Sequence, residues 1–115
     1  MVKQLLPYLF FLLGSFSAFS MQAQEQELMI NGQVLEQGSG QPVEFATVML
    51  IKAADQQAVD GTSTLEDGSF TLSAAPGQYE LEVSFIGFEA QRVKNVQVTN
   101  PNVDLGIIKL GENSA

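Results

Sequence analysis

Hydrophobic and polar residues alternate along much of the sequence after residue 27, most clearly between Gln78 and Phe85. In that stretch the odd positions are apolar or aromatic, and the even positions are polar or charged. Successive side chains of a β-strand point to opposite sides of a sheet, so a period of two predicts a strand with one buried face and one wet face. No segment of this region repeats its apolar residues with the period of a helix. The pattern therefore predicts an all-β protein.

Other segments have the composition of strands, and residues that favour turns separate them. Strands are predicted at 28–35, 43–52, 61–65, 69–73 and 102–110, and at 90–99 as one bent strand or two short ones around Asn95. Within 43–52, we expect the side of Ala46, Val48 and Leu50 to face the core. Seven or so strands in about ninety residues is the count of an Ig-like antiparallel β-sandwich.

Turn chemistry and position add two expectations about how these strands are arranged. Glu66, Asp67 and Gly68 are expected to close a tight hairpin between the strands at 61–65 and 69–73. The strands at 28–35 and 90–98 are expected to be the sheet edges most open to pairing with another chain.

The first 23 residues have the layout of a secretory signal peptide. Lys3 precedes an apolar run at 5–19, and small and polar residues follow that run. Glycine and serine dilute the run, which is shorter than the roughly 20 apolar residues that span a bilayer; a retained N-terminal anchor is the alternative. Cleavage is expected after Ala23 or after Ser20, and the start of the polar QEQE stretch favours Ala23.

The chain accordingly divides into a signal peptide at 1–23, one domain at 24–110 and a tail or linker at 111–115. After removal of the signal peptide, four cations face thirteen acids, which gives a net charge of −9. Such a charge repels nucleic acid and anionic lipid. With no cysteine in the sequence, the exported domain must be stabilised by an apolar core rather than by disulfides.

The residue types that are missing argue against catalysis. The sequence contains no histidine and no cysteine, so it offers no imidazole base, no thiol nucleophile and no zinc site of the usual kind. Glu80 and Glu82 share one face of their strand and are expected to be solvated charges. We therefore expect neither enzymatic activity nor a cofactor. Tyr79 and Phe88 are expected to pack in the core rather than to stack on a sugar.

Two groups of residues remain as candidate sites. Asp60, Glu66 and Asp67 surround the expected hairpin and are weak candidates for a calcium site, although the segment does not match the EF-hand loop pattern. Phe45 and Met49 lie on the side of the 43–52 strand opposite Ala46. They form either a partner patch or an ordinary surface that neighbouring chain covers.

Four segments in sequence order resemble the carboxypeptidase regulatory-like domain. They are INGQVLEQGSGQPVEFATVML, GTSTLEDGSFTL, APGQYELEVSFIGF and VDLGIIKL, which together span residues 30 to 110. The resemblance implies a transthyretin-like, seven-stranded sandwich. It concerns the accessory domain of carboxypeptidases and not their zinc-bearing catalytic domain. Leu65 stands where the family often has an aspartate, so the resemblance does not strengthen the calcium hypothesis.

The variety that this sequence most resembles is the domain found at the N-terminus of TonB-dependent outer-membrane receptors. It implies a location in the periplasm or at the outer membrane, with a protein partner or the rest of a receptor, no nucleic acid, and contact with the membrane only through an associated barrel. A plug and barrel do not fit into 115 residues, so we expect a truncated or stand-alone spacer or docking module. The alternatives are a free-standing secreted domain that binds glycans or other ligands, and an accessory domain of a hydrolase.

Overall fold

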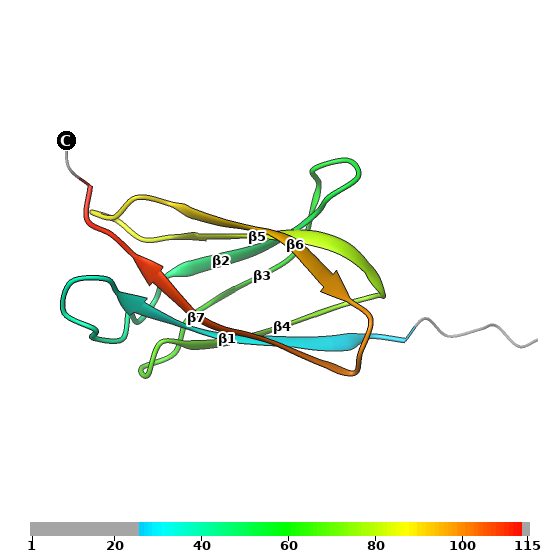
Figure 1. The fold of residues 1–115 in the computed structure, drawn as a ribbon, viewed down its shortest axis with the longest axis horizontal. Helices are drawn as coiled ribbons and strands as arrows, with labels where there is room; N and C mark the ends of the chain where they lie inside the picture. The colour runs from blue at the N-terminus through cyan, green and yellow to red at the C-terminus, as the bar shows by residue number, and fades with distance from the viewer. Residues whose placement is uncertain (1–25, 114–115) are drawn as a thin grey trace, which may run out of the picture.

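The computed structural model describes residues 26–113, which form two β-sheets packed face to face (Figure 1). The strands are β1 (Leu28–Glu36), β2 (Thr47–Lys52), β3 (Ala58–Ser63), β4 (Ser69–Ala74), β5 (Gly77–Ser84), β6 (Gln91–Val98) and β7 (Asn102–Leu110). One sheet has the order β4-β1-β7 and the other the order β3-β2-β5-β6. The expected seven-stranded all-β sandwich is confirmed. The predicted signal peptide and both predicted cleavage positions lie outside the described residues, and within those residues no helix qualifies as a membrane span.

The inner faces of the two sheets bury the apolar core. On β5, Tyr79, Leu81 and Val83 are buried, while the residues between them are only partly buried. Val48 and Leu50 on β2 are completely buried, so the expected orientation of that strand is confirmed. Burying a side chain of this size contributes roughly 1.5–3 kcal/mol, which makes the core the main source of stability in a domain without disulfides.

Two strand boundaries differ from the prediction. The strand predicted at 43–52 begins only at Thr47, because Phe45 has a φ of 66° and this left-handed conformation interrupts the extended backbone. The strand predicted at 61–65 runs instead from Ala58 to Ser63. It lies at a sheet edge and buries none of its side chains fully, so its sequence carries little alternation.

The tight hairpin expected at residues 66–68 is wrong. β3 pairs with β2 and β4 pairs with β1, so this segment carries the chain from one sheet to the other. The turn itself is present, because the amide of Gly68 donates to the carbonyl of Leu65 and Gly68 has a φ of 82°. Turn residues show where a chain changes direction, but they do not determine which strands pair.

The edges of the sheets are only partly as expected. β6 lies at an edge, which confirms the prediction for 90–98, and it is one strand with an irregular register around Asn95, whose φ is 61°. The prediction for the first strand is wrong, because β1 lies between β4 and β7. The sandwich is also not wholly antiparallel as predicted: β1 and β7 run parallel, with Met29 opposite Asn102 and Glu36 opposite Leu110. Consequently β1 begins at one end of the sandwich and β7 finishes at the other (Figure 1).

Candidate functional site

Phe45 occupies an unusual position at the end of the sandwich where β7 finishes. It belongs to the turn between Val43 and Ala46, and 69% of its surface is exposed. Its positive φ is uncommon for any residue with a side chain and a clear outlier for a bulky aromatic one. The turn therefore presents a large apolar ring to solvent at a cost in backbone strain.

The buried hydroxyl of Thr64 fixes this turn. Its Oγ1 accepts a hydrogen bond from the amide of Ala46 at 2.8 Å and donates one to the carbonyl of Val43. The backbone adds two more bonds, from Phe45 to the carbonyl of Thr64 and from Thr64 to the carbonyl of Ala46. Thr64 is the one polar or charged residue among those described that is buried. Its hydroxyl therefore forms its hydrogen bonds with the turn instead of with water.

A second exposed turn lies beside Phe45. The amide of Phe88 donates to the carbonyl of Phe85, and Gly87 has the positive φ that the third position of a type II turn requires. Ile86 stands at the tip and is 88% exposed. The rings of Phe85 and Phe88, at the two ends of this turn, lie 5.9 Å apart and pack against the core.

Together these side chains form an exposed apolar surface. Phe45, Thr47, Phe85 and Ile86 line a shallow hollow of about 470 Å³, together with Ser84. The exposed Leu65 follows Thr64, whose carbonyl accepts a hydrogen bond from the amide of Phe45. We call Phe45, Leu65, Phe85 and Ile86 the apolar end. Three of the six large hydrophobic residues that are exposed in the described part of the chain belong to it.

The last described residues are fixed beside the apolar end. The amide of Asn113 donates to the carbonyl of Gly87, and the amide of Glu89 donates to the carbonyl of Gly111. Residues 111–113, expected as part of a tail, therefore pair with residues 87–89; the division of the chain at residue 110 stays a prediction.

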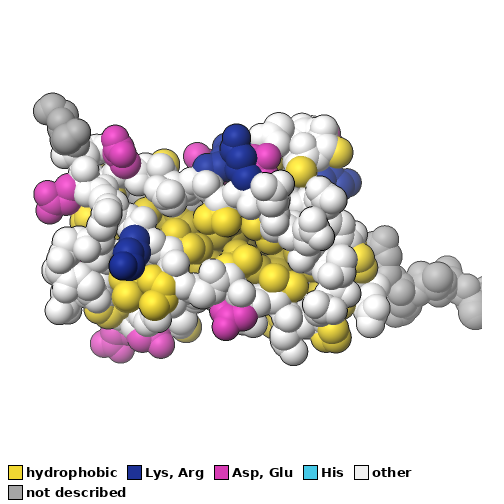
Figure 2. Space-filling view, viewed as in Figure 1, with side chains coloured by type: hydrophobic (Ala, Val, Ile, Leu, Met, Phe, Trp, Pro, Cys, Tyr) yellow, Lys and Arg dark blue, Asp and Glu magenta, His cyan; other side chains and the backbone are white. Residues whose placement is uncertain are grey.

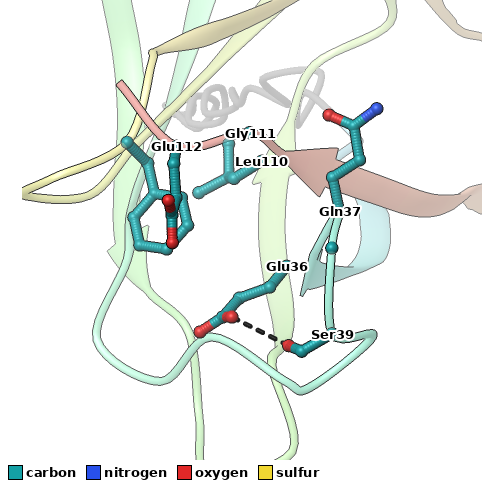
Figure 3. Close-up of a pocket in the computed structure, with 8 residues that line it drawn as sticks. Glu36, Gln37, Ser39, Leu110, Gly111 and Glu112 are labelled. Atoms are coloured by element: carbon teal, nitrogen blue, oxygen red, sulfur yellow. Dashed lines mark hydrogen bonds between the residues drawn. The ribbon is translucent and has the colours of Figure 1, made fainter. Parts of the chain in front are cut away.

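A hollow of about 410 Å³ opens next to this pairing (Figure 3). Two carboxylates line it, those of Glu36 and Glu112, and Glu36 accepts a hydrogen bond from the hydroxyl of Ser39 at 2.8 Å. Nowhere in residues 26–113 does a group of three or more carboxylates gather in a way that would hold a metal ion.

Phe45 and Met49, the residues of the predicted partner patch, have different surroundings. Phe45 shares its hollow with Ile86, whereas Met49 is half-buried on the outer face of β2. The sulfur of Met49 lies against Gly61 of the neighbouring strand. The sequence pattern missed Ile86 and Leu65 as companions of Phe45, because the loops that carry them are far apart along the chain.

The three calcium candidates are not brought together as a ligand set. Asp60 accepts hydrogen bonds from the amides of Gly61 and Ser73, at 2.9 and 3.1 Å. Asp67 accepts bonds from both the amide and the hydroxyl of Ser69, and these bonds lower the pKa of its carboxyl. Glu66 is exposed. Two of the three carboxylates thus accept hydrogen bonds from backbone amides of β3 and β4.

Glu80 and Glu82 lie on the outer face of β5 as the alternation predicts, and Arg92 of β6 connects them. Its guanidinium lies 2.7 Å from Glu80 and 3.7 Å from Glu82. The hydrogen bond from Arg92 holds the pKa of Glu80 below its ordinary value. The pair is therefore suited to cross-strand attraction rather than to proton transfer.

The lowered pKa of Glu80 gives a pH-dependent contribution to stability. A carboxyl whose pKa falls on folding stabilises the folded state at neutral pH, and this contribution disappears as the pH falls through the folded-state pKa. Glu80→Gln is therefore expected to unfold at lower urea concentration than the native chain at pH 7 but at the same concentration in strong acid. Glu66→Gln is the control, and an equal effect of both variants would contradict the assignment to Arg92.

Comparison with known proteins places the fold. Residues 29–108 match the model of the carboxypeptidase regulatory-like domain, which is more than half of the chain. The chain belongs to this family. No curated protein sequence is similar enough to the chain to count as a match.

Solved structures share the sandwich of this carboxypeptidase regulatory-like domain at low sequence identity. A 5-hydroxyisourate hydrolase of Klebsiella pneumoniae superposes with a TM-score of 0.55 and 23% identity, over 70% of this chain and 89% of the hydrolase. A chain of a type II cohesin–X-dockerin complex of Acetivibrio cellulolyticus superposes with a TM-score of 0.61 and 15% identity, over 74% of this chain and 58% of that one. A 9R-lipoxygenase of Cyanothece gives 0.58 and 15%, over 80% of this chain but 18% of the enzyme. This chain thus spans less than two thirds of the length of the cohesin–dockerin chain and of the lipoxygenase. At these sequence identities the similarity to all three structures concerns the fold alone.

Proposed function

We propose that this carboxypeptidase regulatory-like domain is an exported, non-catalytic docking module that binds a protein partner through its apolar end. The observation that carries the proposal is Phe45, a largely exposed ring held in a strained backbone conformation. The partner covers Phe45 and Ile86, and these two side chains supply the apolar contact area that most interfaces have at their centre.

The strain at Phe45 favours docking over simple surface coverage. A bulky residue in the left-handed region costs of order 1–3 kcal/mol, and it persists only where neighbouring contacts hold it in place. Here the four hydrogen bonds between Thr64 and the Val43–Ala46 turn supply that support. Folding alone gains little from an exposed phenyl ring, since glycine would satisfy the same turn without strain.

The cellular context of the proposal comes from the sequence. A signal peptide at residues 1–23 directs the chain out of the cytoplasm, and the domain acts in the periplasm beside a TonB-dependent receptor-like protein of the outer membrane. The parallel β1–β7 pair supports a role as a spacer, because nine residues of extended strand separate the two ends by roughly 30 Å. The apolar end lies at the far end of this span.

Cell fractionation with N-terminal sequencing tests the proposal. The full chain, expressed in a Gram-negative host with a C-terminal tag, is expected to begin at Gln24, or at Met21 if cleavage follows Ser20. It is expected to be protected from protease in intact cells and to sediment with outer-membrane proteins. A full-length chain in the cytoplasm would contradict export, and an exported chain that remains entirely soluble would contradict docking at the membrane.

A specific observation also favours the second candidate function, binding of a polar ligand such as a glycan. The outer face of the β4-β1-β7 sheet carries a hollow of about 610 Å³ whose lining includes Asn31, Gln33, Asp67, Asn102 and Asp104. Amide and carboxylate groups are suited to hydroxyl-rich ligands. A glycan array probed with the mature chain tests this function directly, and binding that Asp104→Ala abolishes would support it over docking.

A further inference from the structure

The two long sides of the sandwich differ in how they are closed. On the β3–β4 side, the chain crosses between the sheets at residues 64–68. In addition, the carboxylate of Asp60 on β3 accepts a hydrogen bond from the amide of Ser73 on β4. On the β6–β7 side, the two strands are joined by the short connection after Val98, and beyond their other ends residues 87–89 pair with residues 111–113. Within the described residues β6 pairs only with β5 and β7 only with β1, so each has one unpaired edge.

A groove runs along this second side and exposes part of the core. Val93 of β6 and Leu105, Ile107 and Lys109 of β7 are among the residues that line a hollow of about 440 Å³. We call it the seam. Val93 and Leu105 are half-buried against the core, and Ile107 is 56% exposed. Figure 2 shows the hydrophobic side chains as a band between the two sheets, with lysine or arginine side chains on both sides of it.

The strands that border the seam are positively charged in an otherwise acidic domain. Three of the four cations in the described residues lie on them: Arg92, Lys94 and Lys109. Arg92 makes both salt bridges found in the described part of the chain, so Lys94 and Lys109 are not engaged in such a pair. β6 and β7 contain one acidic residue, Asp104, whose carboxylate accepts a hydrogen bond from the amide of Gly106. β6 and β7 together thus carry a net charge of +2.

We propose that the seam binds an extended segment of another protein in which apolar and acidic residues alternate. The segment adds to the free edge of β6 or β7 as a further strand, because unpaired amides and carbonyls at a sheet edge are a template for strand addition. Its apolar side chains cover Val93 and Leu105, which face the core, and its carboxylates approach Lys94 and Lys109, which are exposed.

The geometry of the edges also limits the length of the segment. Asn95 and Gly106 have φ values of 61° and 74° and interrupt the register of β6 and β7. Next to the hollow this leaves uninterrupted edges at 91–94 and 107–110, which pair with about four residues of a partner. Such short edges accept a peptide but resist open-ended association of sheets. This proposal does not depend on the apolar end, so the two can fail separately.

Titration with two matched peptides tests the inference. The probes are acetyl-Val-Glu-Val-Glu-Val-amide and the same peptide with lysine in place of glutamate, added to the isotope-labelled mature chain. The glutamate peptide is expected to shift the amide signals of 91–94 and 107–110 and to slow hydrogen exchange along one of these edges. The lysine peptide is expected to bind at least about tenfold more weakly, because its charges face those of the seam.

Charge variants and a modified peptide complete the test. Lys94→Glu with Lys109→Glu is expected to weaken binding of the glutamate peptide about tenfold, and Lys52→Glu, away from the seam on β2, is expected to leave it unchanged. If the double reversal disturbs folding, Lys94→Gln with Lys109→Gln replaces it. N-methylation of alternate peptide amides on the pairing edge is expected to abolish binding. Equal binding of both peptides, no effect of the lysine variants, or undiminished binding of the methylated peptide would each overturn the inference.

Discussion

Gly68→Ala is expected to lower the free energy of unfolding by about 3 kcal/mol or more, which is a large part of the stability of a small domain. Gly68 is buried in the crossover between the sheets and has a φ of 82°. A Cβ at this position would overlap the carbonyl oxygen of Val34 on β1. That part of the backbone is held by two hydrogen bonds, from the Val34 amide to Gly68 and from the Val43 amide to Val34, so it cannot move away freely.

Urea unfolding of the mature chain measures this effect, with Gly38→Ala as the matched control. Gly38 lies in the exposed turn after β1, and a Cβ there would meet no atom within 4 Å. The control is expected to change stability by less than about 1 kcal/mol, and a gain would reflect lower entropy of the unfolded chain. A Gly68→Ala variant as stable as the control would show that the crossover at residues 64–68 is not packed as described.

Thr64→Val is expected to cost about 2–4 kcal/mol although valine has nearly the same shape. The hydroxyl of Thr64 satisfies the Ala46 amide and the Val43 carbonyl in a site that solvent does not reach. Without it both groups stay buried and unpaired, and each carries a desolvation penalty. The Val43–Ala46 turn loses the support for Phe45 as well, so partner binding at the apolar end is expected to weaken beyond the effect on stability.

Two further substitutions separate the contribution of the Thr64 hydroxyl to stability from the contribution of side-chain packing. Thr64→Ser keeps both hydrogen bonds and removes one methyl group, so it is expected to recover most of the stability that Thr64→Val loses. Thr71→Val removes a hydroxyl that donates to Asn31 at the surface, and is expected to cost less than about 0.5 kcal/mol. A Thr64→Ser variant as unstable as Thr64→Val would contradict the role assigned to the hydroxyl.

Much of the fold could be predicted from the sequence because strand alternation is a local signal. The period of two between Gln78 and Phe85 gives β5 and its buried face, and the boundaries of β7 at 102 and 110 are as predicted. Pairing between strands is not local. The turn at residues 66–68 is compatible with a hairpin and with a crossover, and only the packing of whole sheets decides between them.

The candidate site could be predicted only in part, for a similar reason. Phe45 is recognisable as an apolar residue on the side of the 43–52 segment opposite Ala46. Its left-handed backbone is not recognisable, because the support comes from Thr64, nineteen positions further along the chain. Ile86 and Leu65 become neighbours of Phe45 only through the fold. The seam could be predicted in part: 90–98 is expected as a free edge, but the second edge, β7, follows only from the pairing of the whole sheets.

The measurement that tests the central claim most directly compares membrane association of the exported chain with and without the apolar end. Phe45→Ser with Ile86→Ser is the test variant, and Val59→Ser, which removes an exposed apolar residue of β3, is the control. Urea unfolding establishes that all three proteins are equally folded. The test variant is then expected to move from the outer-membrane fraction to the soluble periplasmic fraction while the control stays with the native chain. Equal sedimentation of both variants with the membrane would contradict docking through Phe45 and Ile86.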